Sequence, residues 1–150
     1  MEKLQPKLVT KPWGNELWIA DGIRTPYALK RIFFMSGYRS SLQVHRFKHE
    51  TNYVLTGTGI LQLRSQFFDT ERYLKSSNQE FIIEKALLHL IDIPIVAGDV
   101  IDVKPGQIHR VIAITDLTFI EASTRELDDV IRLADDSSRG HGKINDEHEK

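Results

Sequence analysis

Short segments in which apolar residues alternate with polar ones recur along most of the chain, from Leu17 to about Ile120. They are rich in β-branched and aromatic residues, which favour strands over helices. Turn signals such as SGYRS, TGTG and KPGQ separate them. Many short strands with regular turns predict an all-β sandwich or barrel. The expected strands are residues 16–20, 27–35, 40–47, 52–57, 59–65, 81–84, 99–103, 109–114 and 117–123.

A few regions depart from this pattern. Between Phe67 and Val96 the segment EKALLHLIDI is compatible with a buried strand pair or with one helical turn, and we predict strand. Near the C-terminus, RELDDVIRLADDSS mixes helix and strand periods, which predicts a short helical or irregular segment. Residues 1–12 are polar and predict an arm or edge strand, whereas residues from about 140 to 150 predict a flexible polar tail.

Length and composition narrow the possible functions. A chain of 150 residues, 41% hydrophobic and 27% charged, is expected to form one globular domain over residues 1–150. The net charge of −1 without a basic cluster argues against nucleic acid as a partner. No apolar run has the length of a membrane span or of a signal-peptide core, so we expect a cytoplasmic protein that does not bind membranes. With no cysteine, any metal site must use histidines and carboxylates.

Two histidines and a glutamate have the spacing of a metal site. In SLQVHRFKHETNYVLTG, strand alternation places Gln43, His45 and Phe47 on one face, and Glu50 follows after a tight turn. His109 begins a later strand after a Pro-Gly turn. Two imidazoles and a carboxylate from neighbouring strands suit a divalent metal such as zinc, manganese, iron or nickel, with positions left open for water or substrate. The alternative for each histidine is a hydrogen-bonded side chain without a metal.

The order of these motifs resembles that of a known family. GYRSSLQVHRFKHETNYVLTG and GDVIDVKPGQIHRVIAI are similar to the paired motifs of the cupin superfamily, and Glu50 precedes Gly57 by the family's interval. KPWGNELWIA, YALKRIFFM and FIEASTRELDDVIRLADDSSR further resemble the cupin domain of type II phosphomannose isomerases and of mannose-1-phosphate guanylyltransferases. The resemblance covers about residues 11–139. It implies a single double-stranded β-helix, the cupin jelly-roll barrel.

Two features depart from the family pattern. Phe47 stands where the family has its second histidine, so the usual set of three histidines and one glutamate is incomplete. His49 completes the set as a fourth metal ligand if a bulge turns it inward, whereas regular alternation turns it outward. The region 65–96 is longer than the corresponding family hairpin, and we expect it to cover or reshape the mouth of the barrel.

The resemblance implies a metal-dependent sugar-phosphate isomerase that interconverts mannose 6-phosphate and fructose 6-phosphate. Two alternatives remain open. One is a non-catalytic sugar-binding or regulatory cupin, and the other is a metal-dependent oxygenase of the dioxygenase type. The candidate residues are His49, Lys30 and Glu121 for catalysis and Gln43, Arg110 and Phe47 for substrate binding.

Other residues have simpler expected roles. Trp13 and Trp18 are predicted to pack in the core or at a dimer contact. We expect a homodimer formed through edge strands. Four acidic residues predict a charged surface or a subunit contact rather than a second metal cluster, namely Asp128, Asp129, Asp135 and Asp136.

Overall fold

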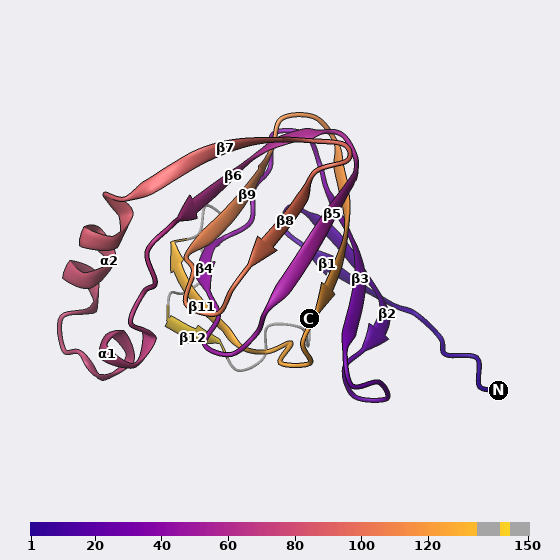
Figure 1. The fold of residues 1–150 in the computed structure, drawn as a ribbon, viewed down its shortest axis with the longest axis horizontal. Helices are drawn as coiled ribbons and strands as arrows, with labels where there is room; N and C mark the ends of the chain where they lie inside the picture. The colour runs from indigo at the N-terminus through magenta and orange to yellow at the C-terminus, as the bar shows by residue number, and fades with distance from the viewer. Residues whose placement is uncertain (135–141, 145–150) are drawn as a thin grey trace.

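Two antiparallel sheets pack face to face in the computed structural model, which describes residues 1–134 and 142–144 (Figure 1). The first sheet has the spatial order β1 (Lys7–Lys11), β2 (Gly14–Asp21), β3 (Ala28–Phe34), β10 (Leu117–Ser123), β5 (Glu50–Thr56), β8 (Val100–Val103). The second has the order β12 (Gly142–Ile144), β11 (Val130–Ala134), β4 (Leu42–Val44), β9 (His109–Ala113), β6 (Thr58–Arg64), β7 (Leu90–Val96). The expectation of an all-β fold is confirmed.

The ends of the chain show how local patterns are resolved by pairing. Strand β1 is the expected N-terminal edge strand and pairs with β2. We predicted a helical or irregular segment before the tail, and this prediction is wrong in part. The segment contains β11, which pairs with both β4 and β12. In this strand Val130, Ile131 and Leu133 are all buried, whereas a solvent-facing helix would expose part of such a run. Of the expected tail, residues 142–144 form β12, and the remainder lies outside the described residues.

The strand prediction between 65 and 96 is correct for β7 and wrong for the two helices before it, α1 (Thr70–Lys75) and α2 (Gln79–Leu87). The carboxylate of Asp69 caps α1 by accepting a hydrogen bond from the backbone N–H of Arg72, 3.0 Å away. On α2, Ile83 and Ala86 are buried on one helix face. Among the described residues, no helix is long and apolar enough to cross a membrane.

The two helices lie against the outer face of the second sheet, where β4 and β11 run (Figure 1). This packing creates a second apolar cluster outside the barrel. None of the residues 65–96 lines the cavity between the sheets, so the helices do not cover that cavity. The members of the outer cluster are Leu42, Val44, Phe68, Tyr73, Ile83, Ala86, Ile108, Ile131 and Leu133.

The main core fills the space between the sheets. Trp13 stacks on Phe34 with ring centroids 3.9 Å apart, and both rings are buried. Trp18 lies in a smaller cluster, and its indole N–H donates to the Glu16 carboxylate over 3.0 Å. Both tryptophans are therefore packing residues, as predicted from their size.

Candidate metal centre

A cavity of about 70 Å³ lies between the two sheets. Part of its wall is apolar and belongs to the main core, including Trp13, Phe34 and Phe119. The rest carries ionisable and amide side chains, so one part of the barrel interior is an apolar core and the other part is polar. These side chains are Glu16, Lys30, Gln43, His45, Lys48, Glu50, Asn52, His109 and Glu121.

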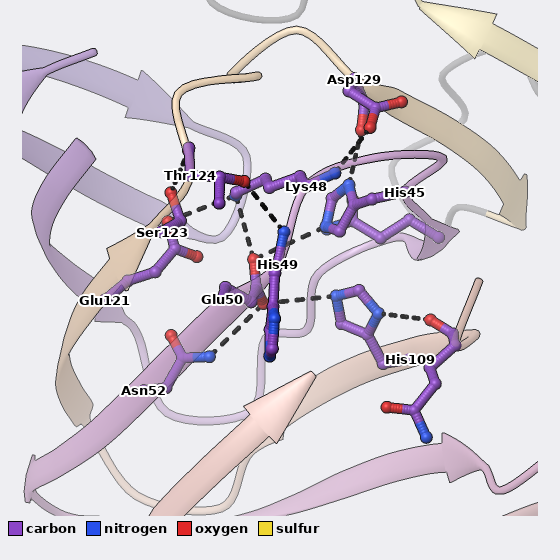
Figure 2. A network of polar contacts seen from close by, with 12 residues as sticks. His45, Lys48, His49, Glu50, Asn52, His109, Glu121, Ser123, Thr124 and Asp129 are labelled. Atoms are coloured by element: carbon purple, nitrogen blue, oxygen red, sulfur yellow. Dashed lines mark hydrogen bonds and ion pairs between the residues drawn. The ribbon is translucent and has the colours of Figure 1, made fainter. Parts of the chain in front are cut away.

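The three predicted metal ligands converge in this cavity (Figure 2). His45 follows β4, Glu50 begins β5 and His109 begins β9, and all three are buried. The Nε2 atom of His45 lies 3.6 Å from one Glu50 carboxylate oxygen, and Nε2 of His109 lies 3.6 Å from the other. One ligand atom from each residue falls within 4.8 Å of the others. The structure thus brings together residues that are far apart in the sequence.

Backbone carbonyls orient both imidazole rings. His45 Nδ1 lies 2.6 Å from the carbonyl oxygen of Asp129, and His109 Nδ1 lies 3.0 Å from that of Gln107. A carbonyl oxygen only accepts hydrogen bonds, so each Nδ1 carries a hydrogen and donates it to its carbonyl, and the other ring nitrogen, Nε2, faces Glu50 in each histidine. Nε2 of His45 is buried without a hydrogen-bond partner among the described residues. Metal-bound histidines show this arrangement, with the second ring nitrogen donating to a carbonyl.

The protonation states also suit a cation. Burial lowers the pKa of His109 to about 4, so its ring is neutral at pH 7. Burial disfavours the charge of Glu50, but the ammonium of Lys48 and the two imidazoles outweigh it and hold the pKa of Glu50 well below its ordinary value. Tetrahedral ligand atoms at metal-binding distance lie about 3.4 Å apart. Each histidine Nε2 lies 3.6 Å from a different Glu50 oxygen, and one ligand atom from each of the three residues falls within 4.8 Å of the others. These residues therefore fit a divalent metal.

His49 does not join this group, which corrects the idea that it supplies a fourth ligand. Its side chain is exposed, and Nε2 contacts the Asp102 carboxylate over 2.8 Å. Phe47 is also exposed, with its ring against the Arg46 guanidinium. Neither residue lines the cavity, so the proposed roles of His49 in catalysis and Phe47 in substrate binding lose their structural basis.

The loop between β4 and β5 explains these positions. The Asp129 carboxylate accepts hydrogen bonds from three consecutive backbone N–H groups, 3.0 Å from Arg46, 2.6 Å from Phe47 and 2.9 Å from Lys48. This bends the chain and ends strand alternation after His45. Asp129 therefore holds the loop that joins His45 to Glu50, a role that its place in an acidic surface segment did not suggest.

Lys48 is the functional candidate that sequence reasoning missed. It is buried in the cavity, whereas alternation continued from β4 turns it outward. Alternation extended backward from β5 finds it, because Glu50, Asn52 and Val54 all face inward at every second position. Lys48 thus lies two residues before Glu50, in line with the inward face of β5.

Two ammonium groups and three carboxylates form a connected chain in the cavity. Lys48 Nζ lies 3.0 Å from Glu50 and 3.3 Å from Glu121. Lys30 Nζ lies 3.1 Å from Glu16 and 3.9 Å from Glu121. Glu121 therefore lies between the two cations. Lys30, Glu121 and Gln43 line the cavity.

Lys48 and Glu121, which are neighbours in this chain of charges, differ in protonation. Burial raises the pKa of Glu121 to about 7, and the negative charge of Glu50 adds to this effect. Burial disfavours the charge of Lys48, but Glu121 and Glu50 outweigh it and hold the pKa of Lys48 above its ordinary value. Lys48 is therefore a permanent cation, whereas Glu121 gains and loses a proton near neutral pH.

Arg110 was a candidate for substrate binding, but it does not line the cavity. Its Nε donates to the carbonyl of Ser40 over 3.0 Å, and its Nη2 contacts the carbonyl of Ala134 over 3.4 Å. These bonds tie the backbone beside β4 to the end of β11. These two contacts of Arg110 are thus with backbone around the barrel.

Replacing Asp129 with alanine is expected to weaken binding of Mn²⁺ about 10-fold, because groups that orient metal ligands typically contribute this much. The loss of three hydrogen bonds to a carboxylate is also expected to lower the free energy of unfolding by on the order of 2 kcal/mol. Calorimetric titration with Mn²⁺ and urea denaturation measure the two effects. Asp128→Ala, at the exposed neighbouring acid, is the control and should change neither. Equal effects of both substitutions would show that the role of Asp129 is not specific.

Comparison with solved structures finds the same fold in several proteins. The capsular polysaccharide assembling protein CapF of Staphylococcus aureus matches with a TM-score of 0.63 and 15% identity, over 89% of this chain and 33% of that chain. KdgF from Halomonas sp. matches with a TM-score of 0.57 and 15% identity, over 84% of this chain and 90% of that chain. An RmlC-like cupin from Shewanella frigidimarina matches with a TM-score of 0.57 and 15% identity, over 83% of this chain and 88% of that chain.

The chain spans about a third of the length of the CapF chains that it matches. No protein-family model matches the sequence. A comparison with curated proteins also found no match. The structural matches show the fold alone, because at 15% identity no activity can be carried over from these proteins. The chain therefore has the cupin fold, with two antiparallel sheets around a buried His-Glu-His group.

Proposed function

We propose that the protein is a metal-dependent enzyme that transfers a proton at a carbon atom next to a carbonyl group, the chemistry of aldose–ketose isomerisation. The observation that carries this proposal is the presence, in one buried cavity, of the His45, Glu50 and His109 group and the carboxyl of Glu121. The first three residues would hold a divalent ion, which would supply positive charge to stabilise an oxygen on which negative charge develops. Glu121 supplies a proton acceptor suited to neutral pH.

Proton transfer by Glu121 accounts for both halves of an isomerisation. The ionised carboxylate takes the proton from C2, and the electrons of that C–H bond form the C1–C2 double bond. The electrons of the C1 carbonyl move to its oxygen, which takes a proton and gives an enediol. Return of a proton to C1, with loss of the proton on the C2 oxygen, completes the ketose. No oxidant or reductant is consumed.

Of the three candidate bases, Glu121 fits this role better than Lys30 or His49. His49 lies outside the cavity. Lys30 is held by Glu16, and its Nζ lies 4.7 Å from the centre of the Trp18 ring. These contacts favour a positioning role for Lys30, because its side chain is held in place while its Nζ lies 3.9 Å from the Glu121 carboxyl.

Sugar phosphates are the substrates we propose, with mannose 6-phosphate and fructose 6-phosphate as the first pair to test. The likeness of the sequence motifs to phosphomannose isomerases supports this choice. The cavity has a volume of about 70 Å³. That space suits the reacting C1–C2 end of a sugar, so the phosphate would lie outside the cavity.

Deuterium exchange tests the proposal without assuming which product accumulates. Protein loaded with Mn²⁺ is incubated with mannose 6-phosphate in deuterated water, and NMR follows loss of the C2 proton. Exchange is expected for the unmodified protein, and it should fall at least about 100-fold in Glu121→Gln, the typical minimum contribution of a general base. The exchange rate should rise with pH through about 7, because only ionised Glu121 accepts a proton.

The matched control is His49→Ala, because this exposed histidine should leave exchange unchanged. His45→Ala should abolish exchange together with metal binding. If the protein binds Mn²⁺ but catalyses no exchange with either sugar phosphate, the isomerase proposal is wrong. Sugar-phosphate binding without exchange would then favour a binding protein, and oxygen consumption would favour an oxygenase.

A further inference from the structure

The charged side chains of the cavity wall, counted together with a bound metal, favour a negatively charged ligand. Its wall carries three carboxylates and two ammonium groups, those of Glu16, Glu50, Glu121, Lys30 and Lys48. A bound divalent ion makes this balance positive, whether Glu121 is ionised or protonated. Since unpaired charge is costly in a buried site, the loaded cavity favours a ligand that brings negative charge with it.

Lys48 is the cation that adjoins the metal ligands. Its Nζ lies 3.0 Å from Oε2 of Glu50, and this same oxygen faces Nε2 of His45 at 3.6 Å (Figure 2). An ammonium group has three N–H donors. Among the described residues, its carboxylate contacts are Glu50 and Glu121, so a donor remains for an oxygen of a bound molecule.

Metal binding changes the pairing of Lys48. A divalent ion bound by Glu50 shares the charge of that carboxylate, so the attraction between Glu50 and the ammonium falls. The other partner, Glu121, is also shared with Lys30 at 3.9 Å. Lys48 is therefore the buried cation whose pairing weakens when the site is loaded, and it points into the same cavity.

We propose that Lys48 is a substrate-binding residue whose ammonium holds an oxygen of the substrate next to the oxygen that the metal polarises. The site thus takes compounds with oxygen atoms on two adjacent carbons and binds them best as anions. This inference rests on the proposed function, because the enediol formed between C1 and C2 is such a compound. Glycolate has the same pair of adjacent oxygens with one negative charge, and ethylene glycol is its neutral counterpart.

Calorimetric titration of the Mn²⁺-loaded full chain with glycolate tests this role without an activity assay. The unmodified protein should bind glycolate at least about 10-fold more tightly than ethylene glycol. Lys48→Met should weaken glycolate binding about 10-fold, the size expected for one hydrogen bond between charged groups. The same variant should bind Mn²⁺ as tightly or more tightly, because the ammonium no longer competes for Glu50. Lys75→Met, at an exposed lysine of α1, is the control and should change neither affinity.

A second variant keeps the test decisive if Lys48→Met does not fold, which a thermal melt would reveal. Glu121→Gln removes one carboxylate partner of Lys48, and it should tighten glycolate binding. Unchanged glycolate affinity in a folded, Mn²⁺-loaded Lys48→Met protein would overturn the inference and leave the metal site standing, as would unchanged affinity in Glu121→Gln. Failure of the unmodified protein to bind Mn²⁺ would overturn the proposed function and the inference with it.

Discussion

Replacing His45 with alanine is expected to weaken Mn²⁺ or Zn²⁺ binding by more than about 100-fold, because even groups that only orient ligands are typically worth 10- to 100-fold. The variant removes a buried Nε2 atom that lies 3.6 Å from Glu50 and has no other partner among the described residues. Calorimetric titration gives the affinity directly. In thermal melts, metal at 100 times its Kd should stabilise the unmodified protein by about 2.7 kcal/mol, and the variant should lose this stabilisation.

The matched control is His49→Ala, four residues further along the same loop. His49 is exposed and contacts Asp102 on the outside of the barrel, so its loss should leave metal affinity unchanged. Metal binding that survives His45→Ala, or that disappears in His49→Ala, would show that the site uses other ligands. A melt without metal separates loss of a ligand from loss of the fold.

Replacing Gly57 with alanine is expected to lower the free energy of unfolding by more than about 3 kcal/mol, the combined size of backbone strain and overpacking. Gly57 joins β5 to β6 with φ +92°, a conformation that side chains disfavour. An added Cβ would lie 2.0 Å from the carbonyl oxygen of Asp116 and 2.9 Å from Cα of Leu117. Both are backbone atoms at the start of β10, so the strand itself would have to shift. Urea denaturation measures the loss.

Gly37→Ala is the matched control for Gly57→Ala. Gly37 has a similar φ of +84°, but an added Cβ would meet no atom within 4 Å. Its substitution should therefore cost only the conformational strain, about 1 kcal/mol. Equal losses in the two variants would show that the close approach of Asp116 is relieved by a small movement of the backbone.

The three candidate metal ligands could be predicted from the sequence because local geometry positions each of them. Alternation along β4 turns Gln43 and His45 towards the cavity, and Glu50 and His109 each begin a strand after a turn. The all-β fold was predictable for the same reason, since alternation and turn residues act over a few positions. Family likeness then supplied the pairing of distant segments that these local rules leave open.

The helices α1 and α2 could not be predicted with the same rules. The segment FIIE has the β-branched composition of a strand, although Asp69 and Asn78 precede the helices as typical starting residues. The helices gain their stability from packing Tyr73 and Ile83 on the outer face of β4 and β11. Contacts between segments so far apart override local propensity.

The sequence by itself determined which strands carry the ligands, because alternation and turns depend on neighbouring residues. Only the tertiary structure decided which side chain between them enters the cavity. Asp129, 81 residues beyond Lys48, accepts hydrogen bonds from the backbone of the loop between β4 and β5. These bonds bend the loop so that Lys48 points into the cavity while Phe47 and His49 face solvent. The backbone N–H groups of an irregular loop need partners, and a partner so distant leaves no mark in the local pattern.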